Sequence, residues 1–129
     1  MQAIEAAVHR WDAENANGAA GPVPRDFAAD AIAQTFEVMV PSRRARGQAP
    51  PGEGERYLFA STDGAGEWAV VFGAEGARPA EPGEGWDLRL AGPASDLMLF
   101  LWGRTGPDAL ALTGDRALAD RFFTLVPPT

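Results

Sequence analysis

The chain contains no cysteine and no lysine, and each absence narrows the possible functions. Without cysteine, disulfides, zinc-thiolate sites and thiol catalysis are impossible. All 11 basic residues are arginine, against 18 acidic residues, so the formal net charge is -7. Because an acidic surface repels polyanions, nucleic acid is not an expected partner.

Long apolar runs are also lacking. The longest run, LMLFLW at residues 97–102, is far shorter than the roughly 20 apolar residues that span a bilayer. The N-terminus has no basic segment followed by an apolar run, so no secretion signal is indicated. We therefore expect a cytoplasmic protein with no membrane span. A chain of 129 residues fits a single domain, residues 1–129.

Two helices are predicted at the N-terminal end. One apolar helical face is formed by Ile4, Val8 and Trp11. This helix runs from about residue 2 to Gly18. A second helix begins at Asp26, which caps it or lies in its first turn, and Pro41 limits it. Together they predict a helical N-terminal part over residues 1–45.

Residues 41–55 are rich in arginine, proline and glycine and have no apolar period. This composition predicts a loop whose basic cluster is a solvated surface. Beyond the loop, residues 55–129 predict an α/β core. Its strands are expected at residues 56–62, 67–73, 86–92 and 109–114, and apolar and polar residues alternate at 56–62 and most clearly at 86–92. The stretch 74–85, broken by glycine and proline, allows at most a short edge strand.

Two further helices complete the predicted core. Residues 93–104 are apolar almost all round, begin with Ser95 or Asp96 as a cap, and stop at Gly103. One contact face would leave large residues wet, so this helix is either sandwiched or lines a cavity. Asp115 caps the last helix. The sum is an α+β fold with about four helices on one face of a mainly antiparallel sheet of four to five strands.

Three segments resemble a known family: HRWDAE (9–14), GPASDLMLFLWGR (92–104) and TGDRALADRF (113–122). They are similar to signatures of the mycothiol-dependent maleylpyruvate isomerase family of actinobacteria. Members of that family join a metal-binding, DinB-like four-helix bundle to a C-terminal domain that resembles the sterol carrier protein fold. The resemblance implies that this chain is that sterol-carrier-protein-like C-terminal domain. It also implies that residues 1–17 correspond to the last helix of the bundle.

The only histidine, His9, lies four residues after Glu5, so both are on one helical stripe. By the resemblance, they match a Glu and a His that ligate a divalent metal such as zinc. The family's other histidine ligand lies on an earlier helix with no counterpart here, and a catalytic zinc takes about three protein ligands. The pair is therefore either an incomplete metal site or a solvated hydrogen-bonded pair. The chain is either a stand-alone domain or a truncated one.

Arg104 is the main candidate for ligand recognition. Its planar guanidinium suits a carboxylate, and by the resemblance an arginine of this domain contacts the acidic substrate or the thiol cofactor. The alternative is that Arg104 bonds the carbonyls at the end of its helix. Arg89 and Arg116 are weaker candidates.

An apolar set on the sheet and its covering helix comprises Trp86, Met98, Phe100 and Trp102. In the sterol carrier fold such residues surround a tunnel for an apolar ligand, and the alternative is that they form ordinary core.

No catalytic residue is identified. The hydroxyls of Ser61, Ser95 and Thr105 have no second histidine and no lysine to activate them. We expect no enzymatic activity and no cofactor for this chain alone, and binding of a small apolar or thiol-linked ligand. One alternative is a part of a mycothiol-using, metal-dependent isomerase or transferase completed by a separate helical-bundle partner. Another is a homodimeric structural module.

Overall fold

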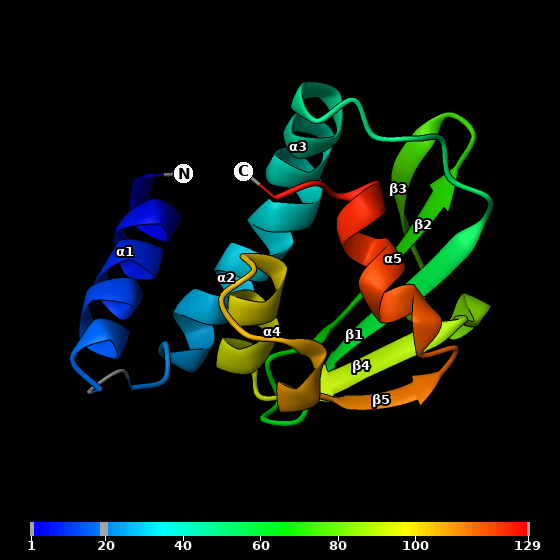
Figure 1. Cartoon of the computed structure of the whole chain (residues 1–129). Helices are drawn as coiled ribbons and strands as arrows, with labels where there is room; N and C mark the ends of the chain where they lie inside the picture. Colours follow the sequence, from blue (N-terminus) through cyan, green and yellow to red (C-terminus); the bar gives the residue numbers. More distant parts are fainter. Residues whose placement is uncertain (1, 19–20, 129) are drawn as a thin grey trace.

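The computed structural model of the chain describes residues 2–18 and 21–128. The helices are α1 (Gln2–Ala16), α2 (Arg25–Gln34), the π-helical turn η1 (Thr35–Met39), α3 (Val40–Arg46), α4 (Ala94–Leu101) and α5 (Ala117–Leu125). Two short 3-10 turns are η2 (Pro82–Glu84) and η3 (Pro107–Ala109). The strands are β1 (Glu55–Ser61), β2 (Glu67–Gly73), β3 (Gly76–Ala80), β4 (Leu88–Gly92) and β5 (Ala111–Gly114). Figure 1 shows α1 as the outermost helix, on the far side of α2 and α4 from the sheet.

The five strands form one sheet in the order β3-β2-β1-β4-β5. Only the central pair β1 and β4 is parallel, and the other three pairs are antiparallel. This confirms the predicted α+β class and the mainly antiparallel sheet. The weak stretch does contain an edge strand, β3, where Pro79 is tolerated because an edge strand needs no complete ladder of N–H donors.

The core centres on Phe122 of α5. Its ring centroid lies 5.3 Å from that of Tyr57, 5.5 Å from Phe59 and 6.1 Å from Phe100, mostly in edge-on or tilted arrangements that aromatic rings prefer. Since Tyr57 and Phe59 are on β1 and Phe100 is on α4, this one ring joins the sheet to two helices.

Helix α4 is buried on nearly all sides, which is one of the two arrangements that its all-round apolar sequence predicts. Seven of its eight residues are buried: Ala94, Ser95, Leu97, Met98, Leu99, Phe100 and Leu101. It ends at Leu101, and Gly103 just beyond it has a left-handed φ of 72° that lets the Arg104 N–H donate to the Leu99 carbonyl at 2.8 Å. Although α4 is apolar, no helix within the described residues is long and apolar enough to cross a membrane.

The cap predicted for α4 is wrong. Ala94, the first residue of the helix, donates its N–H to the carboxylate of Asp63, in the loop after β1, at 3.2 Å. Ser95 instead accepts a bond from the Val23 N–H at 2.8 Å. Asp115 behaves as predicted, because its carboxylate accepts the Ala117 N–H at the start of α5.

The predicted position of Trp86 in a strand is also wrong. Strand β4 begins at Leu88, and Trp86 precedes it with 36% of its surface exposed. Leu88 and Leu90, on the strand itself, are fully buried. The alternation was therefore correct for the strand but was extended two residues too far.

The second helix does not end at Pro41. Helical backbone continues from α2 through η1 and α3 to Arg46, so the loop begins only at Gly47. Pro41 lies in the first turn of α3, where its missing N–H matters least, and the wider turn η1 precedes it. The basic cluster of residues 43–46 is consequently helical, so its successive side chains point in different directions around the helix axis.

Candidate functional site

A groove of about 460 Å³ lies between α1 and the segment that leads into α2. Its volume is within the roughly 300–1,000 Å³ of small-molecule sites. The lining is largely apolar and comprises Ala3, Ala6, Ala7 and Trp11 on one side and Gly21, Pro22, Val23, Pro24 and Phe27 on the other. Trp11 and Phe27 are half-buried, so their rings form part of the groove surface.

The charged residues Arg10 and Glu14 also line the groove. The Arg10 Nε donates to the Glu14 carboxylate at 2.8 Å, and the Arg10 side chain is 84% exposed. Such an exposed ion pair contributes little free energy, so Arg10 and Glu14 can separate and bind other groups at little cost. The groove thus combines apolar walls with one cation and one anion that a ligand can engage.

The wall opposite α1 is fixed to the core. The Val23 N–H donates to Ser95 of α4 at 2.8 Å, and Arg25 donates to the carbonyl of Asp63 at 3.2 Å. Val23 and Phe27 also pack against the buried apolar cluster. This side of the groove is therefore part of the folded body, and α1 forms the other side.

Helix α1 is fastened by a two-pronged ion pair between Asp12 and Arg104. The Arg104 Nε and Nη2 each donate to one Asp12 oxygen at 2.9 Å, and Nη1 donates to the Trp102 carbonyl at 2.8 Å. The hydrogen bonds from Arg104 hold the pKa of Asp12 below its usual value, and the same contact raises the pKa of Arg104. The pair joins residues 92 positions apart in the sequence.

All three guanidinium nitrogens of Arg104 are thus engaged within the chain. An incoming carboxylate has to displace Asp12 to reach them, and the ligand role of Arg104 stays a prediction. Trp102, which supplies the carbonyl, is half-buried, and its indole Nε1 has no hydrogen-bond partner among the described residues.

The remaining predicted ligand residues are not brought together. Met98 and Phe100 are 1% and 0% exposed inside the core, whereas Trp86 lies at the surface beside Gly114. A ligand role for these side chains also stays a prediction. The candidate groove is lined instead by Trp11, which sequence periodicity assigned to the apolar face of the first helix, and by Phe27 of α2.

Glu5 and His9 are both exposed on α1, while Ile4 and Val8 on the neighbouring stripe are 2% exposed. No group of three histidine, aspartate or glutamate side chains that could hold a metal occurs among the described residues. Asp12, one turn further along the stripe, is bound to Arg104. The described part of the chain therefore offers two donors, which do not fit a complete zinc site.

Sequence patterns did not identify Arg43, whose burial and hydrogen bonds make it a candidate functional residue. Although charged, it is only 4% exposed, and it donates to three carbonyls: Leu101 at 2.9 Å, Pro127 at 2.9 Å and Val126 at 3.3 Å. Burial, together with the like charge of Arg46, lowers the pKa of Arg43 to about 10. The predicted solvated cluster is wrong at this position. A helix continued through Pro41 would have placed Arg43 on the buried side, three residues after Val40.

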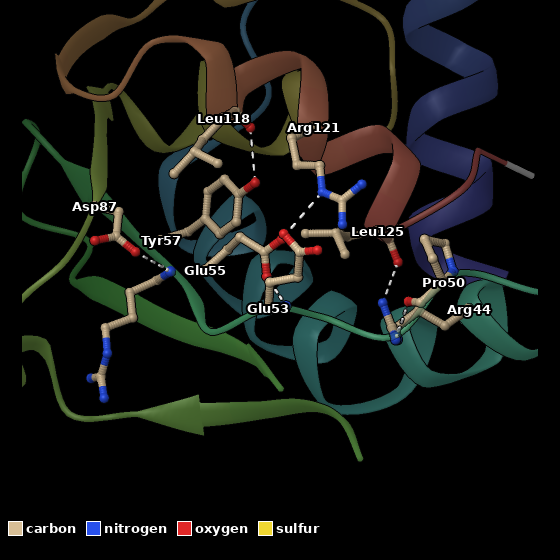
Figure 2. Close-up of polar contacts among 10 residues, drawn as sticks. Arg44, Pro50, Glu53, Glu55, Tyr57, Asp87, Leu118, Arg121 and Leu125 are labelled. Atoms are coloured by element: carbon tan, nitrogen blue, oxygen red, sulfur yellow. Dashed lines mark hydrogen bonds and ion pairs between the residues drawn. The ribbon is translucent and has the colours of Figure 1, made fainter. Parts of the chain in front are cut away.

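Arg44 makes the adjacent contact, which Figure 2 shows. Its Nη1 donates to the Leu125 carbonyl at 2.7 Å and its Nη2 to the Pro50 carbonyl at 3.1 Å. The guanidinium carbon also lies 5.5 Å from the centre of the Phe72 ring, a cation–π distance. Together, Arg43 and Arg44 hold the end of α3 against the end of α5.

Figure 2 also shows Glu55 and Tyr57 of β1 bonded to α5. Arg121 donates to Glu55 at 3.1 Å, and the Tyr57 hydroxyl donates to the Leu118 carbonyl at 2.9 Å. Burial acts to raise the pKa of Glu55, but bonds from the N–H groups of Glu53 and Glu55 and from Arg121 outweigh it, so this pKa is lowered. Burial raises the pKa of Tyr57. Both groups therefore keep their ordinary charge at neutral pH and serve to fasten α5.

Comparison with known proteins gives one family. The family model described as the MDMPI C-terminal domain matches residues 26–121, where MDMPI is mycothiol-dependent maleylpyruvate isomerase. No curated protein matches the chain. Among solved structures, the chain is similar to one titled UbiJ-SCP2 Ubiquinone synthesis protein, with a TM-score of 0.45, 19% identity, and coverage of 74% of this chain and 86% of that one. The family match confirms the predicted resemblance to the C-terminal domain; residues 9–14 lie outside the matched range, so the correspondence of residues 1–17 to the bundle helix stays a prediction.

Breaking the Asp12–Arg104 pair should loosen α1. In a double-mutant cycle of Asp12→Asn and Arg104→Gln, we expect a coupling of about 1 kcal/mol at neutral pH from urea unfolding. Because the pKa of Asp12 is lowered in the fold, this coupling is present above about pH 4 and is lost as the pH falls through the lowered value. The exposed Arg10–Glu14 pair is the matched control and should couple by about 0.4 kcal/mol. A coupling that acid leaves unchanged would contradict this assignment.

Replacing Arg43 should destabilise the whole domain. Arg43→Met leaves three carbonyls without their donor, and we expect a loss of about 3 kcal/mol in the free energy of unfolding. Arg46→Met, three residues away and exposed, should change it by no more than about 0.5 kcal/mol. Chemical denaturation of both variants measures the difference, and equal effects would show that the buried bonds do not matter.

Proposed function

The chain belongs to the family of MDMPI C-terminal domains, and from that premise we propose that it is an accessory domain that binds a small ligand in the groove between α1 and residues 21–27. The observation that carries the proposal is the groove itself, with two half-buried aromatic rings, Trp11 and Phe27, in its walls. A ligand that covers the exposed part of one such ring gains roughly half of the about 1.5–3 kcal/mol that full burial of a large apolar side chain contributes.

The lining indicates the class of ligand. Alanine, proline and aromatic surfaces favour an apolar body, and the Arg10–Glu14 pair offers a partner for one polar or charged end. This supports a small apolar or thiol-linked compound, in keeping with the mycothiol-using family. Since α1 is held by an exposed ion pair, a small shift of α1 can adapt the width of the groove.

Filling the groove should weaken ligand binding without unfolding the protein. Ala6 is exposed on α1 and lines the groove, so Ala6→Trp places a large ring where the ligand would lie. In calorimetric titrations with a fatty acid, a sterol and a mycothiol conjugate, we expect at least one to bind the unaltered chain and to bind Ala6→Trp at least about tenfold more weakly.

The matched control is Ala13→Trp, which adds the same ring at an exposed position of α1 that does not line the groove. It should leave the affinity unchanged. Heat from none of the three compounds, or equal binding by Ala6→Trp, would remove the ligand-binding proposal.

A second candidate function is part of a metal-dependent isomerase or transferase. It is favoured by the exposure of both Glu5 and His9 on α1, a helix fastened to the domain by Asp12 and Arg104. Since two donors are too few, this function requires a partner helical bundle to supply the remaining ligands. No reaction step is assigned to the residues of this chain.

Zinc analysis separates the two candidates. The isolated chain, dialysed after zinc loading, should retain well under about one zinc per chain, because two ligands hold it weakly. If the second candidate is correct, a complex with a bundle partner should retain zinc, and His9→Gln should abolish that retention while Glu14→Gln on the same helix should not. A complex whose zinc content is indifferent to His9 would exclude a metal role for this chain.

A further inference from the structure

A second hollow, of about 220 Å³, lies where α3 ends against the last residues of the chain. It is lined by Arg43, Arg46, Gly47 and Pro128, none of which lines the groove beside α1. Two of these four residues are cations. The hollow therefore differs from the groove both in position and in chemistry.

Arg43 has donors to spare in this hollow. A guanidinium carries five N–H groups, and the three carbonyls of Leu101, Val126 and Pro127 engage one on each nitrogen. Two N–H groups of a nearly buried cation are left without a protein acceptor among the described residues. These two N–H groups can therefore donate to an acceptor that enters the hollow.

The charge of Arg43 and Arg46 is also not balanced locally. The ion pairs formed within residues 2–18 and 21–128 join Arg10, Arg25, Arg56, Arg104 and Arg121 to acidic side chains, and involve neither Arg43 nor Arg46. Carbonyl oxygens contribute only partial negative charge to Arg43. In a chain with a net charge of -7, the hollow thus brings together two arginines that have no acidic partner within the described residues.

The backbone at Gly47 shows that this hollow has little room for a side chain from its own edge. A Cβ at residue 47 would lie 2.6 Å from the Cβ and Cγ of Pro127. Glycine therefore lets the turn after α3 approach the C-terminal segment, and Arg43 and Arg46 line the small opening between them.

We propose that this hollow binds an oxyanion, a phosphate or carboxylate group of a small molecule, between the guanidinium groups of Arg43 and Arg46. Guanidinium N–H groups bond such oxyanions in a charge-assisted geometry, and the acidic remainder of the surface repels anions elsewhere. The lowered pKa of Arg43 is consistent with this, because burial and the neighbouring Arg46 both act against its positive charge and a bound anion relieves both.

Inorganic phosphate and acetate are the probes for the test. At low ionic strength, phosphate, acetate or both should bind with measurable heat and raise the thermal midpoint above that in sodium chloride of equal ionic strength. Binding of phosphate alone would indicate a phosphate group on the natural ligand, and binding of acetate alone would indicate a carboxylate. Arg46→Gln, which removes an exposed cation and spares the fold, should weaken binding about tenfold. Arg78→Gln, on edge strand β3, removes the same charge elsewhere and should leave binding unchanged.

Two outcomes would overturn the proposal. One is that phosphate and acetate act no differently from chloride, or that Arg78→Gln weakens binding as much as Arg46→Gln, which indicates a general charge effect. The other concerns the chain's own terminal carboxylate, tested by appending two glycines after Thr129. Equal affinity with and without the extension supports an external anion, whereas binding by the extended chain alone would show that the hollow serves the terminal carboxylate. Because the variants spare the groove beside α1, failure here leaves the ligand proposal there intact.

Discussion

The buried guanidinium of Arg43 is the contact on which the arrangement of the helices depends. It bonds the last carbonyl of α4 and two carbonyls just beyond α5, so one side chain fixes the end of α3 against the ends of two other helices. Burying a charge without a counter-ion is expensive. The cost is offset because the C-terminal ends of helices carry partial negative charge, which three correctly placed carbonyls direct at the cation.

The ion pair between Asp12 and Arg104 fastens α1 in a similar way, but this pair is partly exposed to solvent. Both side chains are about one-third exposed, so water and salt screen their attraction. Helix α1 is therefore held by this screened ion pair and by the buried side chains of Ile4 and Val8, whereas α3 is held by a buried guanidinium. The groove lies beside α1, while aromatic rings fill the interface of α4, α5 and the sheet.

That filled interface also bears on function. The rings of Phe59, Phe100 and Phe122 occupy the space between the sheet and the helices. Possible binding surfaces are consequently at the junctions between elements: the groove at α1 and the cationic hollow at the end of α3. Their chemistry is opposite, since one is mainly apolar and the other is lined by two arginines.

The sequence by itself determined the α+β class, most strands, the apolar helix around Phe100 and the family, because alternation, helical period and motif are local properties of the chain. Only the tertiary structure decided that Asp63 caps α4, that Arg104 takes Asp12 as its partner, and that Arg43 is buried. Each of these contacts joins residues at least 31 positions apart. Local pattern carries no information about which distant carbonyl or carboxylate the folded chain brings to a side chain, so these contacts could not be predicted from it.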